Sequence, residues 1–299
     1  PSLVKFGRLV EDWRRGRCQA RRRVRLVCMA IPRSWQGEAY NQSKESENRI
    51  HSDEVAKKYG FKGGLVPGVT VSAYLIHPAV EAWGLDWLTR GHASAVVGKP
   101  LYDGRPFRVE VSDATERSYR AVLIDEEDVE CATASVELPE KLPAPPEFRG
   151  DPRIEKGFER PQGTREVMEG LRMQAMRARR ARWDETAGIV SYLRDPSGMP
   201  EPLRADGGGY ANPANTLGIT NWALAGNVKI SPWLHLQTDS QNYAPIPPGS
   251  ELVAEAAIGD LFERKGHEFV DLDVALYFEA TREAAMSARL RAIYRMRGT

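Results

Sequence analysis

The sequence has little of several features that define whole classes of protein. Three cysteines occur among 299 residues (Cys18, Cys28 and Cys131), an odd number without metal-ligand spacing. Their scarcity argues against a disulfide framework or a zinc knuckle and favours free thiols in a reducing compartment. No apolar run approaches the roughly 20 residues of a membrane helix, and no charged-then-apolar signal opens the chain. We therefore expect a cytoplasmic protein with no membrane partner.

The charge balance and the missing motifs remove further classes of function. Lysine and arginine number 42 and aspartate and glutamate 41, so the net charge is +1 and gives no electrostatic reason for a nucleic-acid partner. There is no glycine-rich phosphate loop, and His267-Glu268 has no second histidine four residues further on. Ser94 lacks the flanking glycines of a nucleophile elbow. We expect neither a metal nor another cofactor.

The chain does contain enough apolar sequence for two cores, with a proline-rich boundary between them. Hydrophobic residues make up 41% of the sequence, which is typical of folded proteins, and the length suits two domains of ordinary size. The segment from Pro139 to Pro152 reads PEKLPAPPEFRGDP and holds five of the 20 prolines. Because proline cannot donate to a ladder and disfavours helix before it, we expect an extended linker between residues 1–138 and 153–299.

Both halves show the same order of predicted elements, a helix rich in small residues followed by four strands. The helices are expected from Val69 to Trp83 and from about Pro213 to Asn227. A polar loop from Ser34 to Ser52 and an arginine-rich helix from Arg165 to about Asp184 precede them. The strands are expected at Ala93–Tyr102, Phe107–Val111, Tyr119–Ile124, Val129–Leu138, Trp233–Asn242, Glu251–Leu261, His267–Phe278 and Ala288–Arg295. The repeat predicts an α+β duplication.

One short stretch of the first half carries a recognisable motif. The residues Asn48, Ile50, His51 and Asp53 occur in register, followed by Gly60-Phe61 and Pro67-Gly68. The stretch resembles the MaoC-like and (R)-specific enoyl-CoA hydratase family, whose motif reads Asp-x-Asn-Pro-Leu/Ile-His-x-Asp/Glu. Arg49 stands in place of the usual proline. The resemblance implies a double hotdog, with two antiparallel sheets each wrapped around a central helix.

The resemblance also implies an activity, the hydration or dehydration of an acyl thioester carried on CoA or on acyl carrier protein. Such a reaction needs a base to activate water, an acid to protonate Cα, and donors for the enolate oxygen. By the resemblance, His51 is the general acid/base and Asn48 orients the loop or the water. Gly68 and Val69 stand at the helix start, where a free N–H can meet the thioester oxygen. A homodimer is the expected assembly.

Ser46 departs from the family pattern, because it occupies the position of the catalytic aspartate. A hydroxyl is not a base near pH 7 without a partner, so Ser46 is expected to contact substrate rather than to transfer protons. Glu45 and Glu47 flank it, and Glu47 is the candidate substitute carboxylate. Two alternatives remain open: a hotdog acyl-CoA thioesterase, and a non-catalytic acyl-CoA-binding protein.

The second half has no equivalent of the histidine motif. Asn212-Pro213-Ala214-Asn215 is not followed by histidine, so this half is expected to shape the acyl tunnel or to allow close wrapping of the sheet. Alternation along the strand from Trp233 places His235, Gln237 and Asp239 on one face, which we expect to be solvated or part of an interface, with a second site as the alternative. The arginine run from Arg177 to Arg182 is also expected on a solvated face, with CoA or carrier phosphates as the alternative partners.

Overall fold

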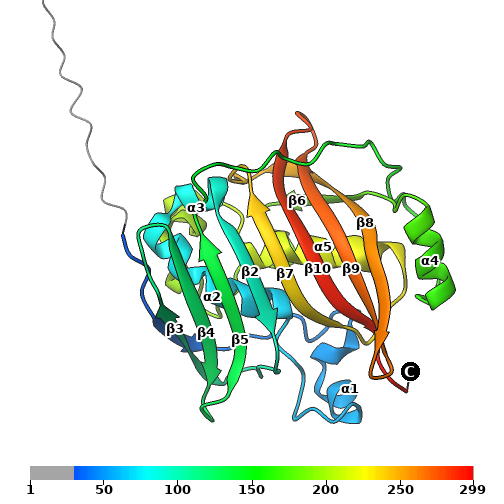
Figure 1. The fold of residues 1–299 in the computed structure, drawn as a ribbon, viewed down its shortest axis with the longest axis horizontal. Helices are drawn as coiled ribbons and strands as arrows, with labels where there is room; N and C mark the ends of the chain where they lie inside the picture. The colour runs from blue at the N-terminus through cyan, green and yellow to red at the C-terminus, as the bar shows by residue number, and fades with distance from the viewer. Residues whose placement is uncertain (1–29, 299) are drawn as a thin grey trace, which may run out of the picture.

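The computed structural model describes residues 30–298, in which one ten-stranded antiparallel sheet packs against two long helices (Figure 1). The strands are β1 (Trp35–Glu38), β2 (His92–Val97), β3 (Pro106–Ser112), β4 (Ser118–Asp125), β5 (Glu130–Glu137), β6 (Arg179–Trp183), β7 (Leu234–Asn242), β8 (Ser250–Arg264), β9 (His267–Phe278) and β10 (Ala284–Arg295). The helices are α1 (Asp53–Lys58), α2 (Gly68–Trp83), α3 (Leu85–Arg90), α4 (Arg165–Met173) and α5 (Pro213–Asn227), with 3-10 turns η1 (Arg49–His51), η2 (Pro196–Gly198), η3 (Glu201–Leu203) and η4 (Ala205–Gly207).

The two halves of the chain each contribute five adjacent strands to the sheet. The strand order is β1-β3-β4-β5-β2-β7-β10-β9-β8-β6. At the centre β2 pairs with β7, from His92 opposite Gln241 to Val96 opposite Gln237. The sequence predicts two sheets, whereas the structure has one continuous sheet. The reason is that each half presents an edge strand whose unpaired backbone groups satisfy those of the other.

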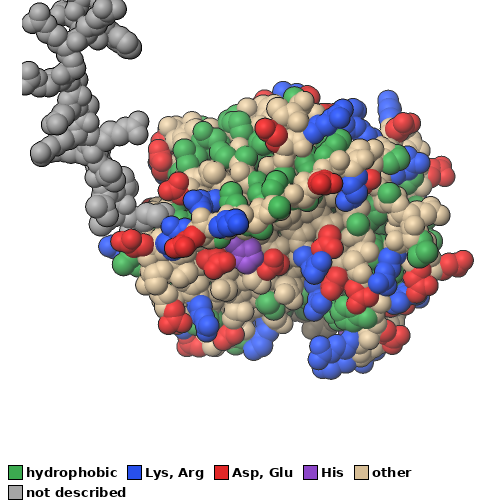
Figure 2. Space-filling model, turned by 45° about the horizontal axis from the view of Figure 1, so that its top comes forward, with side chains coloured by type: hydrophobic (Ala, Val, Ile, Leu, Met, Phe, Trp, Pro, Cys, Tyr) green, Lys and Arg blue, Asp and Glu red, His purple; other side chains and the backbone are tan. Residues whose placement is uncertain are grey.

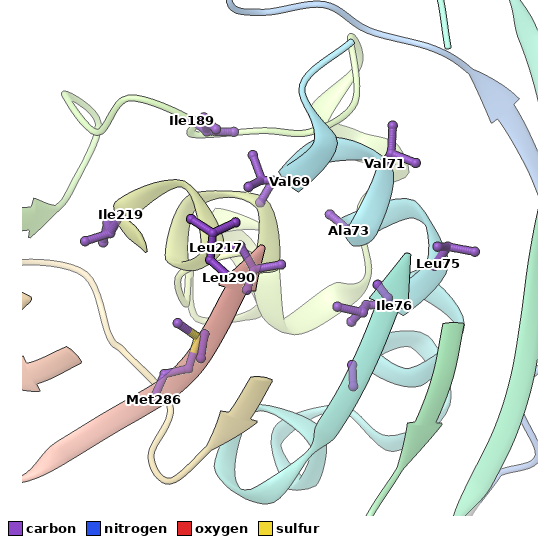
Figure 3. Close-up of a cluster of buried hydrophobic side chains, with 14 of the residues drawn as sticks. Val69, Val71, Ala73, Leu75, Ile76, Ile189, Leu217, Ile219, Met286 and Leu290 are labelled. Atoms are coloured by element: carbon purple, nitrogen blue, oxygen red, sulfur yellow. The ribbon is translucent and has the colours of Figure 1, made fainter. Parts of the chain in front are cut away.

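Helices α2 and α5 contact each other and lie on one face of the sheet (Figure 1). Helix α2 contacts β2, β4, β5 and β7, and α5 contacts β6, β8, β9 and β10. Because α2 packs against the sheet on one side and against α5 on another, most of its residues are buried, and Val69, Leu75 and Ile76 are at most 2% exposed. Figure 3 shows these side chains in one cluster with Leu217 of α5 and Leu290 of β10. Both predicted helices are confirmed.

Several predicted elements have the wrong bounds, and β10, for example, begins at Ala284 rather than Ala288. The arginine-rich helix ends at Met173, and Arg179–Trp183 forms β6, because its alternating Arg-Ala-Arg-Trp pattern pairs with β8. The predicted polar loop contains β1, a short strand that pairs with β3. Strand β2 ends at Val97, since Gly98 and the following proline interrupt the ladder.

The segment from Pro139 to Pro152 contains no helix or strand, and most of its side chains are exposed. Its end is fixed to β8 by Glu255, which is 0% exposed. The carboxylate of Glu255 accepts hydrogen bonds from the backbone N–H groups of Arg149, Gly150 and Asp151 at 2.8, 2.7 and 2.8 Å. The division into residues 1–138 and 153–299 remains our proposal.

The described part of the chain offers few general clues to function. No helix among residues 30–298 is long and apolar enough to cross a membrane. Over the same range, no group of three or more His, Cys, Asp or Glu side chains is arranged to hold a metal ion. Cys131 is a buried free thiol, while Cys18 and Cys28 lie outside the described residues. On the face shown in Figure 2, acidic and basic side chains are interspersed.

Candidate active site

The loop that carries the histidine motif is fixed by three contacts. Asn41 Nδ2 donates to the carbonyl oxygen of His51 at 2.9 Å, and Asp53 Oδ1 accepts from the N–H of Gly64 at 2.7 Å. Ile50, in η1, is 1% exposed and anchors the turn in a small apolar cluster. A Cβ on Gly64 would lie 2.1 Å from the His51 carbonyl oxygen, so only glycine fits at this close approach. The backbone of His51 is thereby held in place.

In the imidazole ring of His51, one nitrogen is bound to the protein backbone and the other contacts the side chain of Asn48. Nδ1 donates to the carbonyl oxygen of Leu65 at 2.8 Å, because a carbonyl can only accept. This bond fixes the tautomer and leaves Nε2 unprotonated in the neutral ring. Burial lowers the pKa of His51, against a smaller raising effect of the Leu65 carbonyl. Nε2 is therefore unprotonated at neutral pH.

Asn48 orients this nitrogen and links the two halves of the chain. Its Oδ1 accepts from the N–H of Trp233 at 3.1 Å, and its Nδ2 donates to the carbonyl oxygen of Trp233 at 3.0 Å. The fixed donor and acceptor of the Trp233 backbone determine which way the amide points. Nδ2 also lies 3.3 Å from His51 Nε2, which must then be the acceptor. Two independent contacts thus define the same tautomer.

The first turn of α2 provides free backbone donors beside the histidine. Pro67 precedes the helix, and its carbonyl accepts from the N–H groups of Thr70 and Val71 at 2.9 and 3.0 Å. The N–H groups of Gly68 and Val69 have no hydrogen-bond partner among residues 30–298, as is usual in a first helical turn. These groups carry the positive end of the helix dipole and can stabilise an oxyanion.

Two cavities meet at His51. The smaller, of about 110 Å³, is lined by Gly68 and by apolar residues of the two central strands and their loops. The larger, of about 420 Å³, is lined by Ser46, Glu47 and Val69 and by one side of α5. Both cavities share five lining residues, which are Asn48, His51, Pro67, Asn221 and Trp233. All six predicted site residues therefore line one or both of these cavities.

Ser46, at the position of the expected carboxylate, and its neighbour Glu47 both have other partners. Ser46 Oγ donates to the carbonyl oxygen of Asn48 at 3.3 Å. The Glu47 carboxylate pairs with Arg160, at 2.8 and 3.2 Å, and its side chain is 78% exposed. The hydrogen bond from Arg160 lowers the pKa of Glu47. This carboxylate is a neutralised ion-pair partner and is not aimed at His51 by any hydrogen bond.

His235 is a buried member of the site that the sequence places incorrectly. The predicted solvated face is wrong for this residue, which is 9% exposed. The pairing of β7 with β10 shifts beside Leu236, and this bulge reverses the alternation on which the prediction depends. Nδ1 of His235 bonds Asn221 Oδ1 at 2.9 Å, and Nε2 bonds the Thr238 hydroxyl at 2.6 Å. Burial lowers the pKa of His235 to about 3, so the ring is neutral.

His235 also explains why α2 begins with glycine. A Cβ on Gly68 would lie 2.9 Å from His235 Cδ2 and 3.0 Å from its carbonyl oxygen. The helix start therefore packs directly on β7 of the second half. The site is built from both halves, although only the first carries the motif.

A long helix packed on antiparallel strands, present twice in one chain, defines the double hotdog class. No family model matches the sequence, and no curated protein matches it. A conserved protein of Mycobacterium tuberculosis, described as having a double hotdog fold, is similar over 89% of this chain and 96% of that one, with a TM-score of 0.54 and 16% identity. A Chloroflexus aurantiacus protein, assigned as a MaoC domain dehydratase, covers 90% of this chain and 95% of its own, with a TM-score of 0.55 and 10% identity. The predicted double hotdog fold is confirmed.

Proposed function

We propose that the chain is a MaoC-like hydratase or dehydratase that acts on a 2-enoyl thioester of CoA or of acyl carrier protein. The proposal rests on the protonation and the position of the His51 ring. Its ring is neutral, its unprotonated Nε2 has only a 3.3 Å contact with Asn48 Nδ2, and His51 lines both cavities. Gly68 and Val69, whose N–H groups are free, each line one of the same cavities. A base and an oxyanion site within one enclosure are what addition of water to a conjugated thioester requires.

The residues of the site can account for both proton transfers of the hydration. Water replaces Asn48 Nδ2 as the hydrogen-bond donor to Nε2 of His51, and Nε2 takes a proton from this water as the water oxygen bonds to Cβ. The electron pair of the double bond moves toward the thioester, and the N–H groups of Gly68 and Val69 stabilise the enolate oxygen. The imidazolium then returns its proton to Cα, which restores the free base. Dehydration follows the same path in reverse.

We assign both proton transfers to His51 because the other bases among the described residues that line the two cavities have partners of their own, including His235, whose two ring nitrogens bond Asn221 and Thr238. Ser46 stands where the family has aspartate, and Glu47 is paired with Arg160. Asn48 keeps the ring in the reactive tautomer, and Ser46 lines the cavity in which water and acyl group meet. A thioesterase would use a carboxylate to direct water at the carbonyl carbon. Glu47 is the one carboxylate among the described residues that line the two cavities, and its ion pair does not favour that role.

The test is a panel of trans-2-enoyl-CoA substrates of increasing chain length. Loss of the absorbance of the conjugated double bond without thiol release supports the proposal. Thiol release would indicate a thioesterase instead. Tight binding without turnover, and no activity gained by Ser46→Asp, would indicate the binding protein.

A further inference from the structure

The larger cavity carries a positive charge that the proposed hydration does not use. Its charged lining residues are Glu47, Arg160 and Arg179. Glu47 and Arg160 neutralise each other, and Arg160 Nη1 also donates to the carbonyl oxygen of Ala225 at 2.9 Å. Arg179 is left over, because no acidic side chain of residues 30–298 forms an ion pair with it. The cavity therefore has a net charge of +1.

The surroundings of Arg179 hold its guanidinium inside the fold. The side chain extends from β6 to α5, where a Cβ on Gly226 would lie 3.3 Å from Nη1. Nε is buried and has no hydrogen-bond partner. Burial, together with the charge of Arg160, lowers the pKa of Arg179, against a smaller raising effect of the Glu47 carboxylate, which is itself paired with Arg160. An arginine that is half-buried without a counter-ion is costly unless an anion arrives to bind it.

We propose that Arg179 binds a carboxylate at the far end of the acyl group, so that the substrate is a thioester of a short unsaturated dicarboxylic acid. The inference rests on the proposed hydration and narrows its substrate. A guanidinium pairs with a carboxylate through two parallel hydrogen bonds and rejects a methyl group at the same place. Arg179 and His51 line one cavity, so the carboxylate and the reacting double bond would occupy it together.

An acyl thioester could bring two kinds of anion to Arg179: a carboxylate at the end of the acyl group, or a phosphate of CoA or of a carrier protein. The size of the cavity favours the carboxylate. A sphere of 420 Å³ is about 9 Å across, which fits an acyl chain of a few carbons with a terminal carboxylate. The nearest phosphate of CoA or of a carrier protein is about 13 bonds from the thioester sulfur, or about 16 Å at ~1.2 Å per bond of an extended chain. A phosphate would therefore lie beyond the cavity that holds both Arg179 and His51.

The experiment compares substrates that differ only in the carboxylate. Trans-glutaconyl-CoA and trans-2-pentenoyl-CoA both have five acyl carbons and serve for turnover. Their saturated counterparts, glutaryl and pentanoyl thioesters, serve for calorimetric binding, both as CoA thioesters and as pantetheine thioesters without phosphate. The variants are Arg179→Gln and Arg179→Lys. Arg180→Gln is the matched control, because Arg180 follows on the same strand, is 65% exposed and bonds Glu279 at 3.1 Å.

The wild-type protein is expected to bind the glutaryl thioesters at least about tenfold more tightly than the pentanoyl thioesters, in line with a hydrogen bond to a charged group. Arg179→Gln should abolish this preference, Arg179→Lys should keep part of it, and Arg180→Gln should keep all of it. Equal binding of both pantetheine thioesters by the wild-type protein overturns the proposal. So does an Arg179→Gln protein that loses affinity equally for both CoA thioesters but for neither pantetheine thioester, which would assign Arg179 to phosphate.

The same experiment distinguishes a wrong substrate assignment from a wrong proposed function. If neither enoyl-CoA is turned over while the glutaryl preference and its loss in Arg179→Gln persist, the carboxylate site stands and the proposed function falls. Circular dichroism and thermal unfolding of each variant check folding. If Arg179→Gln does not fold, the wild-type preference and the Arg179→Lys protein decide the outcome.

Discussion

The free energy of unfolding should fall as the pH is lowered, and it should fall before the carboxylates become protonated. The reason is that burial keeps three histidines neutral in the folded protein. His77 of α2 stacks on Trp35 with ring centroids 3.9 Å apart and bonds the Tyr192 hydroxyl at 3.0 Å. Burial lowers the pKa of His77 to about 4 and that of His235 to about 3. The pKa of His51 is lowered for the same reason.

The direction of the effect follows from the unfolded state, in which histidine has a pKa near 6.5. Below that pH these histidines bind protons in the unfolded chain but not in the folded chain. The free energy of unfolding therefore falls as the pH falls from about 6.5 toward the pKa values of the folded state. Between pH 8 and pH 5, His77 and His235 should each remove about 2 kcal/mol from the free energy of unfolding. His51 adds to this loss. His92 opposes it slightly, because its hydrogen bond to Asp239 raises its pKa.

Urea unfolding at pH 8, 7, 6 and 5 measures the effect. The expected total loss is about 4 kcal/mol or more by pH 5, above the range in which unfolded carboxylates titrate. Replacing His77 with Phe should reduce the pH dependence by about 2 kcal/mol, since one proton fewer is bound on unfolding. Replacing the surface residue His92 with Gln should not reduce it. An unfolding free energy at pH 5 equal to that at pH 8 would refute the reasoning.

Two further predictions concern the neighbours of His51. Asn48→Ala should lower the free energy of unfolding by about 1–3 kcal/mol, because both backbone groups of Trp233 lose their partner, and should also lower turnover. Denaturation and initial rates test this, and an unchanged stability would contradict it. Glu47→Gln should change turnover by less than about threefold, since an exposed ion pair contributes little. A loss of turnover above tenfold would indicate that Glu47 is the catalytic carboxylate.

Local signals in the sequence were sufficient for many elements of the fold. Pro213 opens α5, and the predicted bounds of this helix and of β9 agree with the structure. The motif groups His51, Asn48 and Gly68, and these three residues line one cavity of the structure. These features depend on capping, periodicity and spacing, which are properties of neighbouring residues.

Features that depend on distant residues could not be predicted in the same way. The pairing of β2 with β7, and the contact of Asn48 with Trp233, join segments that carry no sign of each other in the sequence. The bulge beside Leu236 turns His235 inward, yet alternation gives no warning of a bulge. The sequence does not show that Arg179 has no ion-pair partner, because this depends on the pairing of Glu47 with Arg160 in the folded chain.

The most direct test of the account is the hydration rate of the His51→Ala protein on a trans-2-enoyl-CoA that the unmodified protein hydrates, with His92→Ala as the surface control. The account predicts that turnover falls by about two to four orders of magnitude, the usual contribution of general acid–base catalysis, while thioester binding and folding are retained. The control should keep full activity. Full turnover by His51→Ala would contradict the central claim that this histidine moves the protons.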